Sequence, residues 1–295
     1  MKEVSVRLNS DLPVILDGAM GTQLLDRGLD LKPPLWSAEI LELSPIIIEE
    51  IHKDYIKVGA EIITTNTFRT TTRTFRKVFQ NNLEKARKHA WKSCKIAVNA
   101  ARKAAGKDVF VAGSIGPLED CYIPELFPGE QVGLYEYNEI GEWLDEAGVD
   151  LFLIETMGRI DEARCALRAV DKYRVEKWVS FLIKDANTIF DGTNLRTGSM
   201  AVESEGASAI LINCSKLDAA VQAMELIANT VSIPVGVYPN LGKSSPRPKS
   251  AIKELFSEQE FVRWMKRAVS SGARIIGGCC GSSPKYIEAL KNSLK

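Results

Sequence analysis

Short apolar segments separated by longer amphipathic segments dominate the hydrophobic pattern of the chain. Eight of them are bounded by turn-forming residues and are short enough for strands. They cover residues 14–17, 61–65, 109–115, 150–155, 178–183, 208–214, 234–239 and 274–279. Each is almost continuously apolar, which indicates burial on both faces, as in a parallel sheet.

Helical patterns lie between almost all of these strands. Residues 45–59 follow Ser44, the expected N-cap, and 82–106 and 260–272 show the same amphipathic pattern. Four helices end in a glycine directly before an apolar strand, at Gly59, Gly148, Gly206 and Gly272. This repeated unit predicts one domain over residues 1–295, a (β/α)8 TIM barrel of class α/β. An open doubly wound sheet is the alternative, but no glycine-rich dinucleotide fingerprint follows the first strand.

Composition and charge narrow the class of partner. Thirty-eight basic residues balance thirty-eight acidic ones, and no basic cluster is interleaved with aromatic residues. We therefore expect small-molecule substrates, and neither nucleic acid nor membrane as a partner. The N-terminal segment lacks the pattern of a signal peptide, and no apolar run approaches the length of a membrane span, so we expect a cytoplasmic protein. In that compartment the six cysteines are expected as thiols or metal ligands rather than disulfides.

The chain has two histidines, His52 and His89, and both fall inside helical patterns. We interpret both as helix-surface residues. A histidine-based catalytic triad or a polyhistidine metal site is therefore hard to build from this sequence.

Three cysteines stand at one end of two predicted strands. Active-site residues of a TIM barrel lie at the C-terminal ends of its strands, where Cys214 ends 208–214, and Cys279 and Cys280 end 274–279. The two strands are alternate members of the barrel, so their inward side chains can converge. Flanking glycines relax the backbone enough for two adjacent cysteines to face one ion. Three thiolates and one open position are the arrangement of a catalytic zinc site, so we predict Zn²⁺ as cofactor.

The other three cysteines have simpler interpretations. Cys94 and Cys165 lie on predicted helices and are expected to be small apolar core residues. Cys121 lies in the loop after 109–115 and is interpreted as a core residue or a free thiol. A disulfide between the adjacent Cys279 and Cys280 would be strained, so it is not favoured.

Further polar and aromatic residues gather at the same strand ends. Glu155 follows four apolar residues, so it would be buried and would need a cation from a ligand ammonium or from a barrel Arg or Lys. Asp17 could instead cap the Asp-Gly turn, the asparagines could form turns, and Phe68 could simply pack. The candidate substrate-binding residues are Asp17, Gly18, Asn66, Phe68, Glu155, Asn213 and Asn240.

Seven short motifs, spread from residue 17 to residue 281, together resemble a known family. DGAMGT, TTNTF, GSIGP, ETM, INCS, YPN and GGCCG are similar to the homocysteine-binding domain of the homocysteine S-methyltransferases. The pairing of GGCCG with an upstream NCS is the specific part of this resemblance. It implies a zinc-dependent barrel that methylates homocysteine to methionine, with Cys214, Cys279 and Cys280 matching the zinc ligands and no catalytic residue beyond the zinc centre.

The resemblance also implies roles for residues around the thiols. Glu155 and the Asp17-Gly18 turn match positions that hold the polar end of the amino acid. Asn240 matches a position that in some members approaches zinc when substrate is absent. The loops LEDCYIPELFPG and LGKSSPRPKS depart from the usual family forms, and both would border the methyl donor.

Donor, acceptor and assembly are the remaining expectations. The chain ends soon after Gly281, without the C-terminal arm of betaine-dependent members, so we expect a monomer. A compact chain with an anionic zinc site favours a methylsulfonium donor, S-methylmethionine ahead of S-adenosylmethionine. The alternatives are betaine as donor, selenocysteine as acceptor, a non-catalytic zinc or thiol-sensing barrel, and a metal-free enzyme with a cysteine nucleophile.

Overall fold

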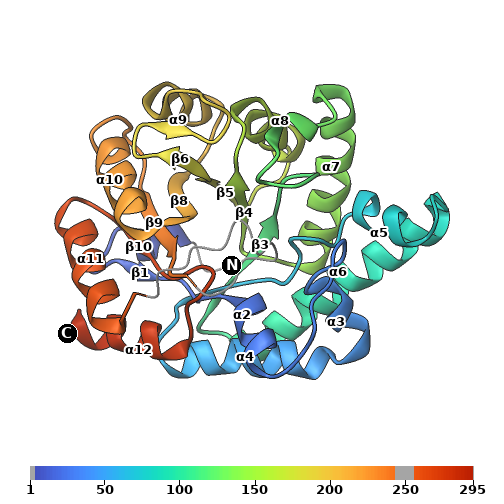
Figure 1. The fold of residues 1–295 in the computed structure, drawn as a ribbon, viewed down its shortest axis with the longest axis horizontal. Coiled ribbons are helices and arrows are strands. Elements are labelled where there is room, and N and C mark those ends of the chain that lie inside the picture. The colour runs from blue at the N-terminus through green and yellow to red at the C-terminus, as the bar shows by residue number, and fades with distance from the viewer. Residues whose placement is uncertain (1–3, 243–255, 295) are drawn as a thin grey trace.

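The computed structural model describes residues 4–242 and 256–294. Its strands are β1 (Val14–Ile15), β2 (Ile62–Thr64), β3 (Phe110–Ile115), β4 (Leu151–Met157), β5 (Glu176–Phe181), β6 (Ile183–Asp185), β7 (Thr188–Ile189), β8 (Ala209–Lys216), β9 (Val235–Asn240) and β10 (Ile275–Ile276). Its helices are α1 (Val4–Leu8), α2 (Met20–Asp26), α3 (Ala38–Leu43), α4 (Pro45–Lys57), α5 (Thr72–Val78), α6 (Leu83–Ala105), the 3₁₀ helix η1 (Pro124–Leu126), α7 (Glu130–Ala147), α8 (Ile160–Val170), α9 (Leu195–Ser204), α10 (Leu217–Ala228), α11 (Glu258–Ser270) and α12 (Pro284–Ser293). Figure 1 shows how the helices surround the strands.

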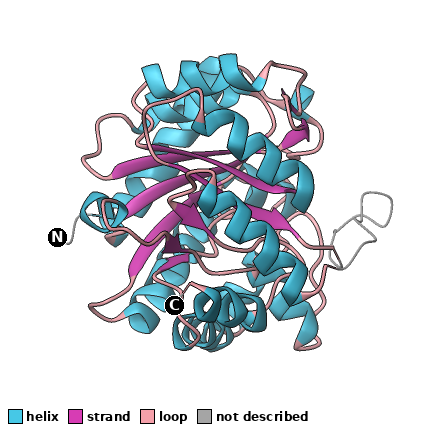
Figure 2. Cartoon of the chain, turned by 90° about the vertical axis from the view of Figure 1, so that its left-hand side faces the viewer, coloured by secondary structure: helices cyan, strands magenta, loops and turns pink. Residues whose placement is uncertain are grey.

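Eight parallel strands form the barrel. Their order is β1-β10-β9-β8-β5-β4-β3-β2, and a parallel bridge between Leu16 and Ile62 joins β1 to β2. The strands run side by side through the middle of the molecule with helices on both sides (Figure 2). The expected (β/α)8 TIM barrel is therefore confirmed.

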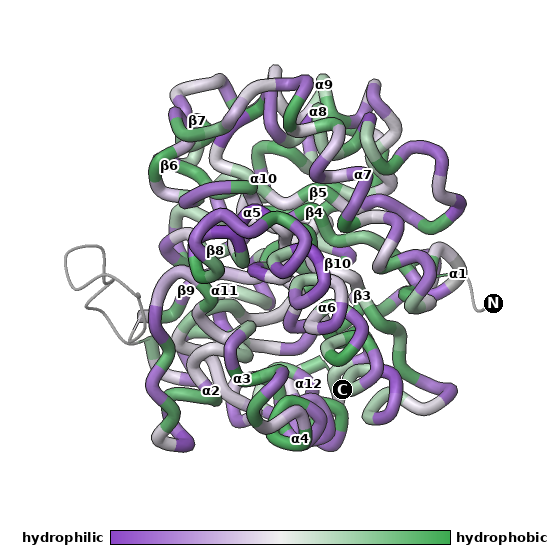
Figure 3. Tube along the Cα trace, turned by 90° about the vertical axis from the view of Figure 1, so that its right-hand side faces the viewer, coloured by the Kyte–Doolittle hydropathy of each residue, from purple (hydrophilic) through white to green (hydrophobic). Residues whose placement is uncertain are grey.

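Side chains of each strand alternate between the barrel interior and the surrounding helices. Leu151 and Leu153 of β4 belong to the interior cluster, whereas Phe152 and Ile154 pack in the outer cluster beneath the helices. Because side chains of a strand alternate with a period of two, the next inward position of β4 is Glu155. In Figure 3 hydrophobic and hydrophilic stretches alternate along the outer helices, which cover the barrel with one face.

Helix α1 packs at the end of the barrel where the strands begin. Val4 and Leu8 are 2% and 5% exposed and join the interior cluster. The Arg274 guanidinium, which precedes β10, donates to the Leu8 carbonyl at 2.7 Å. Apolar contacts thus fill this end, and the polar residues of the interior lie toward the other end. No helix among the described residues is long and apolar enough to cross a bilayer.

Two regions differ from the sequence-based expectation. The predicted strand 178–183 leaves the barrel after Phe181, and its last residue begins the antiparallel β6–β7 hairpin, which the sequence pattern did not predict. The predicted strand 274–279 is regular only over β10, because Gly277 and Gly278 follow. Their backbone N–H groups still bond to neighbouring chain segments, at the carbonyls of Val237 and Asp17.

The surface position expected for His52 is wrong. His52 lies on α4 one turn after Ile48, on the face that packs against the barrel, and is fully buried. Neither of its ring nitrogens has a hydrogen-bond partner, and burial lowers its pKa to about 4. His89 is partly exposed, and its Nδ1 lies 2.9 Å from the Glu42 carboxylate.

Candidate active site

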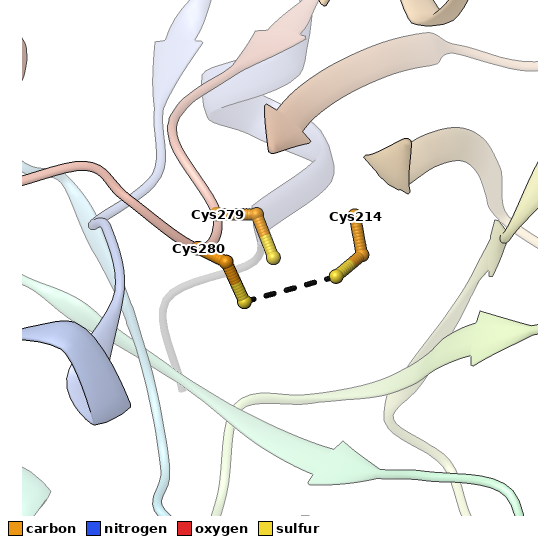
Figure 4. A group of neighbouring side chains, drawn as sticks. All are labelled: Cys214, Cys279 and Cys280. Atoms are coloured by element: carbon orange, nitrogen blue, oxygen red, sulfur yellow. Dashed lines mark hydrogen bonds between the residues drawn. The ribbon is translucent and has the colours of Figure 1, made fainter. Parts of the chain in front are cut away.

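Three cysteine side chains meet at the carboxyl end of the barrel. Cys214 lies near the end of β8, and Cys279 and Cys280 follow β10 on the far side of β9. The Sγ atoms of Cys214 and Cys280 are 3.8 Å apart, and all three sulfurs lie within 4.8 Å of one another (Figure 4). All three residues are partly exposed, so this thiol cluster can be reached from outside.

Glycines allow the two adjacent cysteines to turn into the cluster. A Cβ on Gly277 would lie 2.7 Å from the Leu16 Cβ, so a side chain there would push β10 away from its neighbour. Gly281 has a φ of +83°, and its Cβ would lie 1.8 Å from the Gly242 carbonyl oxygen. Cys214 itself has a φ of 49°, an uncommon conformation for a residue with a side chain. The backbone conformation that brings the thiols together is therefore locally strained at Cys214.

The thiol cluster fits a zinc ion. Zinc–thiolate bonds of about 2.3 Å in a tetrahedron place neighbouring sulfurs about 3.8 Å apart. The Cys214–Cys280 separation of 3.8 Å has this value. Among the described residues no fourth Cys, His, Asp or Glu joins the group. Three soft ligands with a free fourth position suit zinc and a substrate sulfur.

The charge of the thiol cluster depends on a bound cation. Hydrogen bonds from the thiols of Cys279 and Cys280, and then from Tyr122 and Asn240, hold the pKa of Cys214 well below its usual range, against the effect of burial. The interaction with Cys214 in turn raises the pKa of both Cys279 and Cys280. The three thiols therefore do not ionise independently, and a bound cation would favour their thiolate forms.

Tyr122 borders the thiol cluster, and sequence reasoning missed it. Its hydroxyl lies 3.8 Å from the Cys214 sulfur, although the two residues are 92 positions apart. The negative charge of Cys214 raises the pKa of this phenol. Its position in the loop after β3, at the catalytic end, was the available signal, but a tyrosine in a loop carries no information about distance.

A buried carboxylate, Glu155, lies beside the thiols. It is 9% exposed and accepts hydrogen bonds from the hydroxyls of Ser114 and Tyr238, the latter at 3.2 Å. The Asn213 amide lies at the limit of hydrogen bonding, 3.5 Å away. Burial raises the pKa of Glu155 to about 7 despite these bonds. The carboxyl group is therefore poised between its neutral and charged forms near neutral pH.

Asp17 is the second buried carboxylate at this end of the barrel. Its two oxygens accept from the backbone N–H and the hydroxyl of Thr64, at 2.8 and 3.1 Å. Burial raises its pKa to about 8, with a smaller contribution from Glu155. Among the described residues neither carboxylate forms an ion pair with Lys, Arg or His, so the alternative of a barrel Arg or Lys as partner finds no support.

Asn213 holds these groups in position. Its side-chain oxygen accepts from the Thr156 backbone N–H at 3.1 Å and from the Ser180 hydroxyl at 2.8 Å. Its amide donates to the Thr156 hydroxyl at 2.8 Å. Thr156 has a φ of 61°, so Asn213 stabilises a strained residue next to Glu155.

The other candidate binding residues are placed differently. Asn66 bonds to Ser37 through both polar atoms, accepting from its hydroxyl and donating to its carbonyl at 3.0 Å. Phe68 packs so closely on Gly116 that a Cβ there would lie 2.7 Å from the ring. Asn240 accepts from the Gly242 N–H at 2.9 Å while its side chain also reaches Cys214.

Gly18 and the following turn are packed against the chain beyond GGCCG. A Cβ on Gly18 would lie 2.6 Å from the Ser282 hydroxyl oxygen and 2.8 Å from the Tyr55 ring. The Ser282 hydroxyl accepts from the Ala19 N–H at 3.0 Å and donates to the Cys279 carbonyl at 2.7 Å. Ser282 therefore connects the Asp17-Gly18 turn to the thiol cluster.

The remaining cysteines are buried in the fold. Burial raises the pKa of Cys94 and Cys121 to about 12 and that of Cys165 to about 11. These thiols are protonated at neutral pH and therefore poor nucleophiles. Of the segment LGKSSPRPKS, which was expected to border the donor, residues 243–250 lie outside the described part of the chain.

Comparison with known proteins identifies the family. Residues 14–294 match the family model described as homocysteine S-methyltransferase. The chain belongs to the homocysteine S-methyltransferase family. Its relatives include homocysteine S-methyltransferase of Escherichia coli, with 30% identity over 94% of both chains. Selenocysteine Se-methyltransferase of Brassica oleracea var. italica is 28% identical over 95% of this chain and 88% of the relative.

Solved structures of a family member resemble the whole chain. The metallated form of the homocysteine methyltransferase MmuM from Escherichia coli aligns over 98% of both chains, with a TM-score of 0.82 and 28% identity. Its oxidized form aligns over 96% of both chains, with a TM-score of 0.83 and 29% identity. The barrel and its connections are thus shared with this family member along almost the entire sequence.

Proposed function

We propose that this protein is a zinc-dependent methyltransferase that moves a methyl group from a sulfonium donor to the thiolate of L-homocysteine, giving methionine. One observation carries the proposal: Cys214, Cys279 and Cys280 converge at the barrel mouth. A tetrahedral zinc held by these three residues would have one position left for a substrate sulfur. Membership of the homocysteine S-methyltransferase family and the metallated form of a structural relative support it. When bound, zinc would supply the acceptor sulfur as a thiolate at neutral pH.

The carboxylates would recognise the amino-acid end of the acceptor. Glu155 and Asp17 are buried, and neither forms an ion pair with another residue of the described chain. A buried charge without a partner is costly, so a ligand ammonium that enters this site would offset that cost. The neighbouring Gly18 leaves room for close packing of the turn, and Asn213 holds Thr156 and Glu155 in place.

The transfer itself requires little from acid or base groups. The acceptor thiolate attacks the donor methyl carbon, a new carbon–sulfur bond forms, and the bond to the sulfonium sulfur breaks. The electron pair of that bond remains on the donor sulfur, which leaves as a neutral thioether and needs no proton. This agrees with a site whose described surroundings contain no histidine.

S-methylmethionine is the donor we favour, ahead of S-adenosylmethionine. A sulfonium cation is attracted to an anionic centre of three thiolates. With S-methylmethionine, both the methylated acceptor and the demethylated donor are methionine, so each turnover yields two methionine molecules. Asn66, Phe68 and Asn240 are expected to border the substrates. The isolated protein is expected to be a monomer.

A donor panel at fixed homocysteine tests the proposal. Zinc-loaded protein is supplied with S-methylmethionine, S-adenosylmethionine, betaine or methyltetrahydrofolate. Two quantities are measured: the methionine formed and the zinc bound per chain. We expect one zinc per chain and methionine from a sulfonium donor, and Cys279→Ser should lose both. Cys165→Ser is the matched control, because that thiol is buried away from the cluster, and it should retain both. Zinc binding without methionine from any donor would favour the non-catalytic barrel instead.

The acceptor is tested in the same assay. The similarity to a selenocysteine Se-methyltransferase makes selenocysteine the second acceptor to examine. We expect a higher kcat/KM with homocysteine. A higher kcat/KM with selenocysteine would leave the mechanism at the thiol cluster unchanged and would make selenocysteine the acceptor.

A further inference from the structure

Tyr122 lies beside the thiol cluster and packs against a second aromatic residue, Phe190, and neither residue belongs to the seven family motifs. Tyr122 comes from the loop between β3 and α7, and Phe190 follows the β6–β7 hairpin. Their ring centroids are 6.0 Å apart and their planes meet at 76°, an edge-to-face arrangement. Both residues are only partly buried. Two segments that the strand-and-helix pattern left as connections therefore form one aromatic wall, defined as Tyr122 and Phe190.

Tyr122 places one side of the aromatic wall where a methyl donor has to bind. Reacting atoms must approach to about 3–3.5 Å for group transfer, so the donor has to lie against the thiol cluster. The Tyr122 hydroxyl is already 3.8 Å from the Cys214 sulfur. A donor that reaches a sulfur held by this cluster is thus within reach of the Tyr122 ring.

The backbone holds the wall rigidly. The Tyr122 N–H donates to the Asp120 carboxylate at 3.0 Å, and the Phe190 N–H donates to the Leu182 carbonyl at 3.1 Å. Both segments press on Gly158, since a Cβ at this glycine would lie 2.9 Å from the Cys121 carbonyl oxygen and 3.4 Å from the Phe190 Cβ. The two rings therefore need little reorganisation when a ligand binds.

Among the described residues, the cations that lie over aromatic rings are elsewhere. They are Arg69 over Phe68, Lys85 over Phe79, Lys95 over Trp91, Lys172 over Tyr173 and Arg267 over Trp264. No lysine or arginine of the described chain covers Tyr122 or Phe190 in this way. A sulfonium has no N–H or O–H to donate, so its charge is recognised by negatively charged groups and by the faces of aromatic rings.

We propose that Tyr122 and Phe190 bind the sulfonium group of the methyl donor through their ring faces and so select a cationic donor. This inference rests on the proposed function for the reaction, and it adds the residues that determine donor specificity. The hydroxyl of Tyr122, directed at Cys214, positions its ring rather than contacting the donor.

Direct binding to the zinc-loaded protein without acceptor tests the wall. Calorimetry compares S-methylmethionine with 2-amino-5-methylhexanoic acid, in which a neutral carbon replaces the sulfonium sulfur. The wild type should prefer the cation about three- to thirtyfold, the range for a cation–π contact. Phe190→Leu and Tyr122→Leu should each remove much of this preference, whereas Tyr122→Phe, which keeps the ring, should retain it. Phe79→Leu is the matched control, because Phe79 is a partly buried ring directly after α5, and this substitution should leave the cation preference unchanged.

Kinetics give a second measurement. Phe190→Leu should raise the KM for the donor about three- to thirtyfold while the KM for homocysteine and the zinc content stay unchanged. An unchanged cation preference in both leucine variants, or a wild type that binds the two ligands equally, would overturn the inference. The two proposals can fail separately. If the wild type prefers the cation and the leucine variants lose this preference, but the protein forms no methionine, only the proposed reaction is contradicted.

Discussion

The two sides of the barrel mouth handle buried negative charge in different ways. On the thiol side, Cys214, Cys279 and Cys280 hydrogen bond mainly to one another, and these bonds lower the pKa of Cys214 while the interaction with Cys214 raises the pKa of the other two thiols. On the carboxylate side, Asp17 and Glu155 have neutral donors already in place, from Thr64, Ser114 and Tyr238. Burial nevertheless raises both carboxyl pKa values, to about 8 and about 7.

This difference indicates which kind of ligand each side is suited to bind. Three thiols that bond mainly to one another form a site suited to a tightly held metal ion. Two carboxyl groups that remain partly neutral near pH 7 form a site that accepts a cation reversibly, because losing the ligand returns them to a protonated or hydrogen-bonded state. In the proposed function, a resident ion and an exchanging substrate would thus be bound by adjacent groups with different electrostatics.

The largest expected effect is on the thiol side. Cys214→Ala, Cys279→Ala or Cys280→Ala should each abolish zinc retention and turnover, because two remaining thiolates cannot hold the ion tightly. Zinc measured by mass spectrometry and methionine formation are the tests. Cys94→Ala and Cys165→Ala should preserve both, and full zinc occupancy in the Cys214→Ala protein would refute the three-ligand site.

In zinc-free, substrate-free protein, the carboxylate side should lower the free energy of unfolding as pH rises from about 4 to about 8. The folded pKa of Asp17, about 8, exceeds the unfolded value, so the folded state binds more protons between about pH 4 and pH 8. Its contribution to the free energy of unfolding is therefore fully present below about pH 4 and is lost as pH rises through 8. Urea unfolding from pH 5 to pH 9 should show a loss on the order of 3–5 kcal/mol, which Asp17→Asn should largely remove. The same slope in that variant would show that other groups cause it.

Glu155→Gln tests ammonium recognition. The substitution keeps the shape of the side chain and removes the charge, so the homocysteine ammonium would lose its ionic partner. We expect the KM for homocysteine to rise about a hundredfold, or about 3 kcal/mol, with zinc content unchanged. An unchanged KM would place the amino group elsewhere. Glu139→Gln, a buried carboxylate that pairs with Arg87 on the outer helices, is the matched control for folding.

His52 should limit stability on the acid side. Its folded pKa, about 4, lies below the unfolded value of about 6.5, so the unfolded state binds more protons between these values. The contribution of His52 to the free energy of unfolding should fall by about 3 kcal/mol as pH decreases from 6.5 to 4, which offsets the gain from Asp17 over the same range. Relative to the wild type, His52→Leu should therefore become more stable by about this amount between pH 6.5 and pH 4 in urea unfolding. A difference from the wild type that does not change with pH would show that His52 does not cause the effect.

Asn66→Ala should have the smallest effect. It tests whether Asn66 stabilises the fold or binds a substrate directly. Loss of its two bonds to Ser37 should cost about 1–2 kcal/mol of stability, measured by urea unfolding. Because both polar atoms already bond to Ser37, we expect the KM values for both substrates to change less than twofold. A large rise in either KM would restore the direct binding role that the sequence suggested.

The barrel and the chemical types at its mouth could be predicted from sequence. Strand length, continuous apolar character and the glycines at Gly59, Gly148, Gly206 and Gly272 are local features, and all four glycines have positive φ in the structure. The end of each strand is also local information, so Cys214 and Cys279 could be assigned to the same edge. Helix boundaries followed for the same reason, as in α6, which covers Leu83–Ala105 within the predicted 82–106.

Contacts between distant segments were decided only by the tertiary structure. Sequence spacing gives the strand that a residue follows, but the distance from Tyr122 to Cys214 depends on how a loop after β3 packs over β8. His52 has the polarity of a surface residue, and only its position one turn after Ile48 against the barrel makes it buried. Phe190 contacts Tyr122 through a hairpin that follows an interrupted strand. Local periodicity therefore determined the architecture and the candidate ligands, whereas the packing of connections determined which side chains surround them.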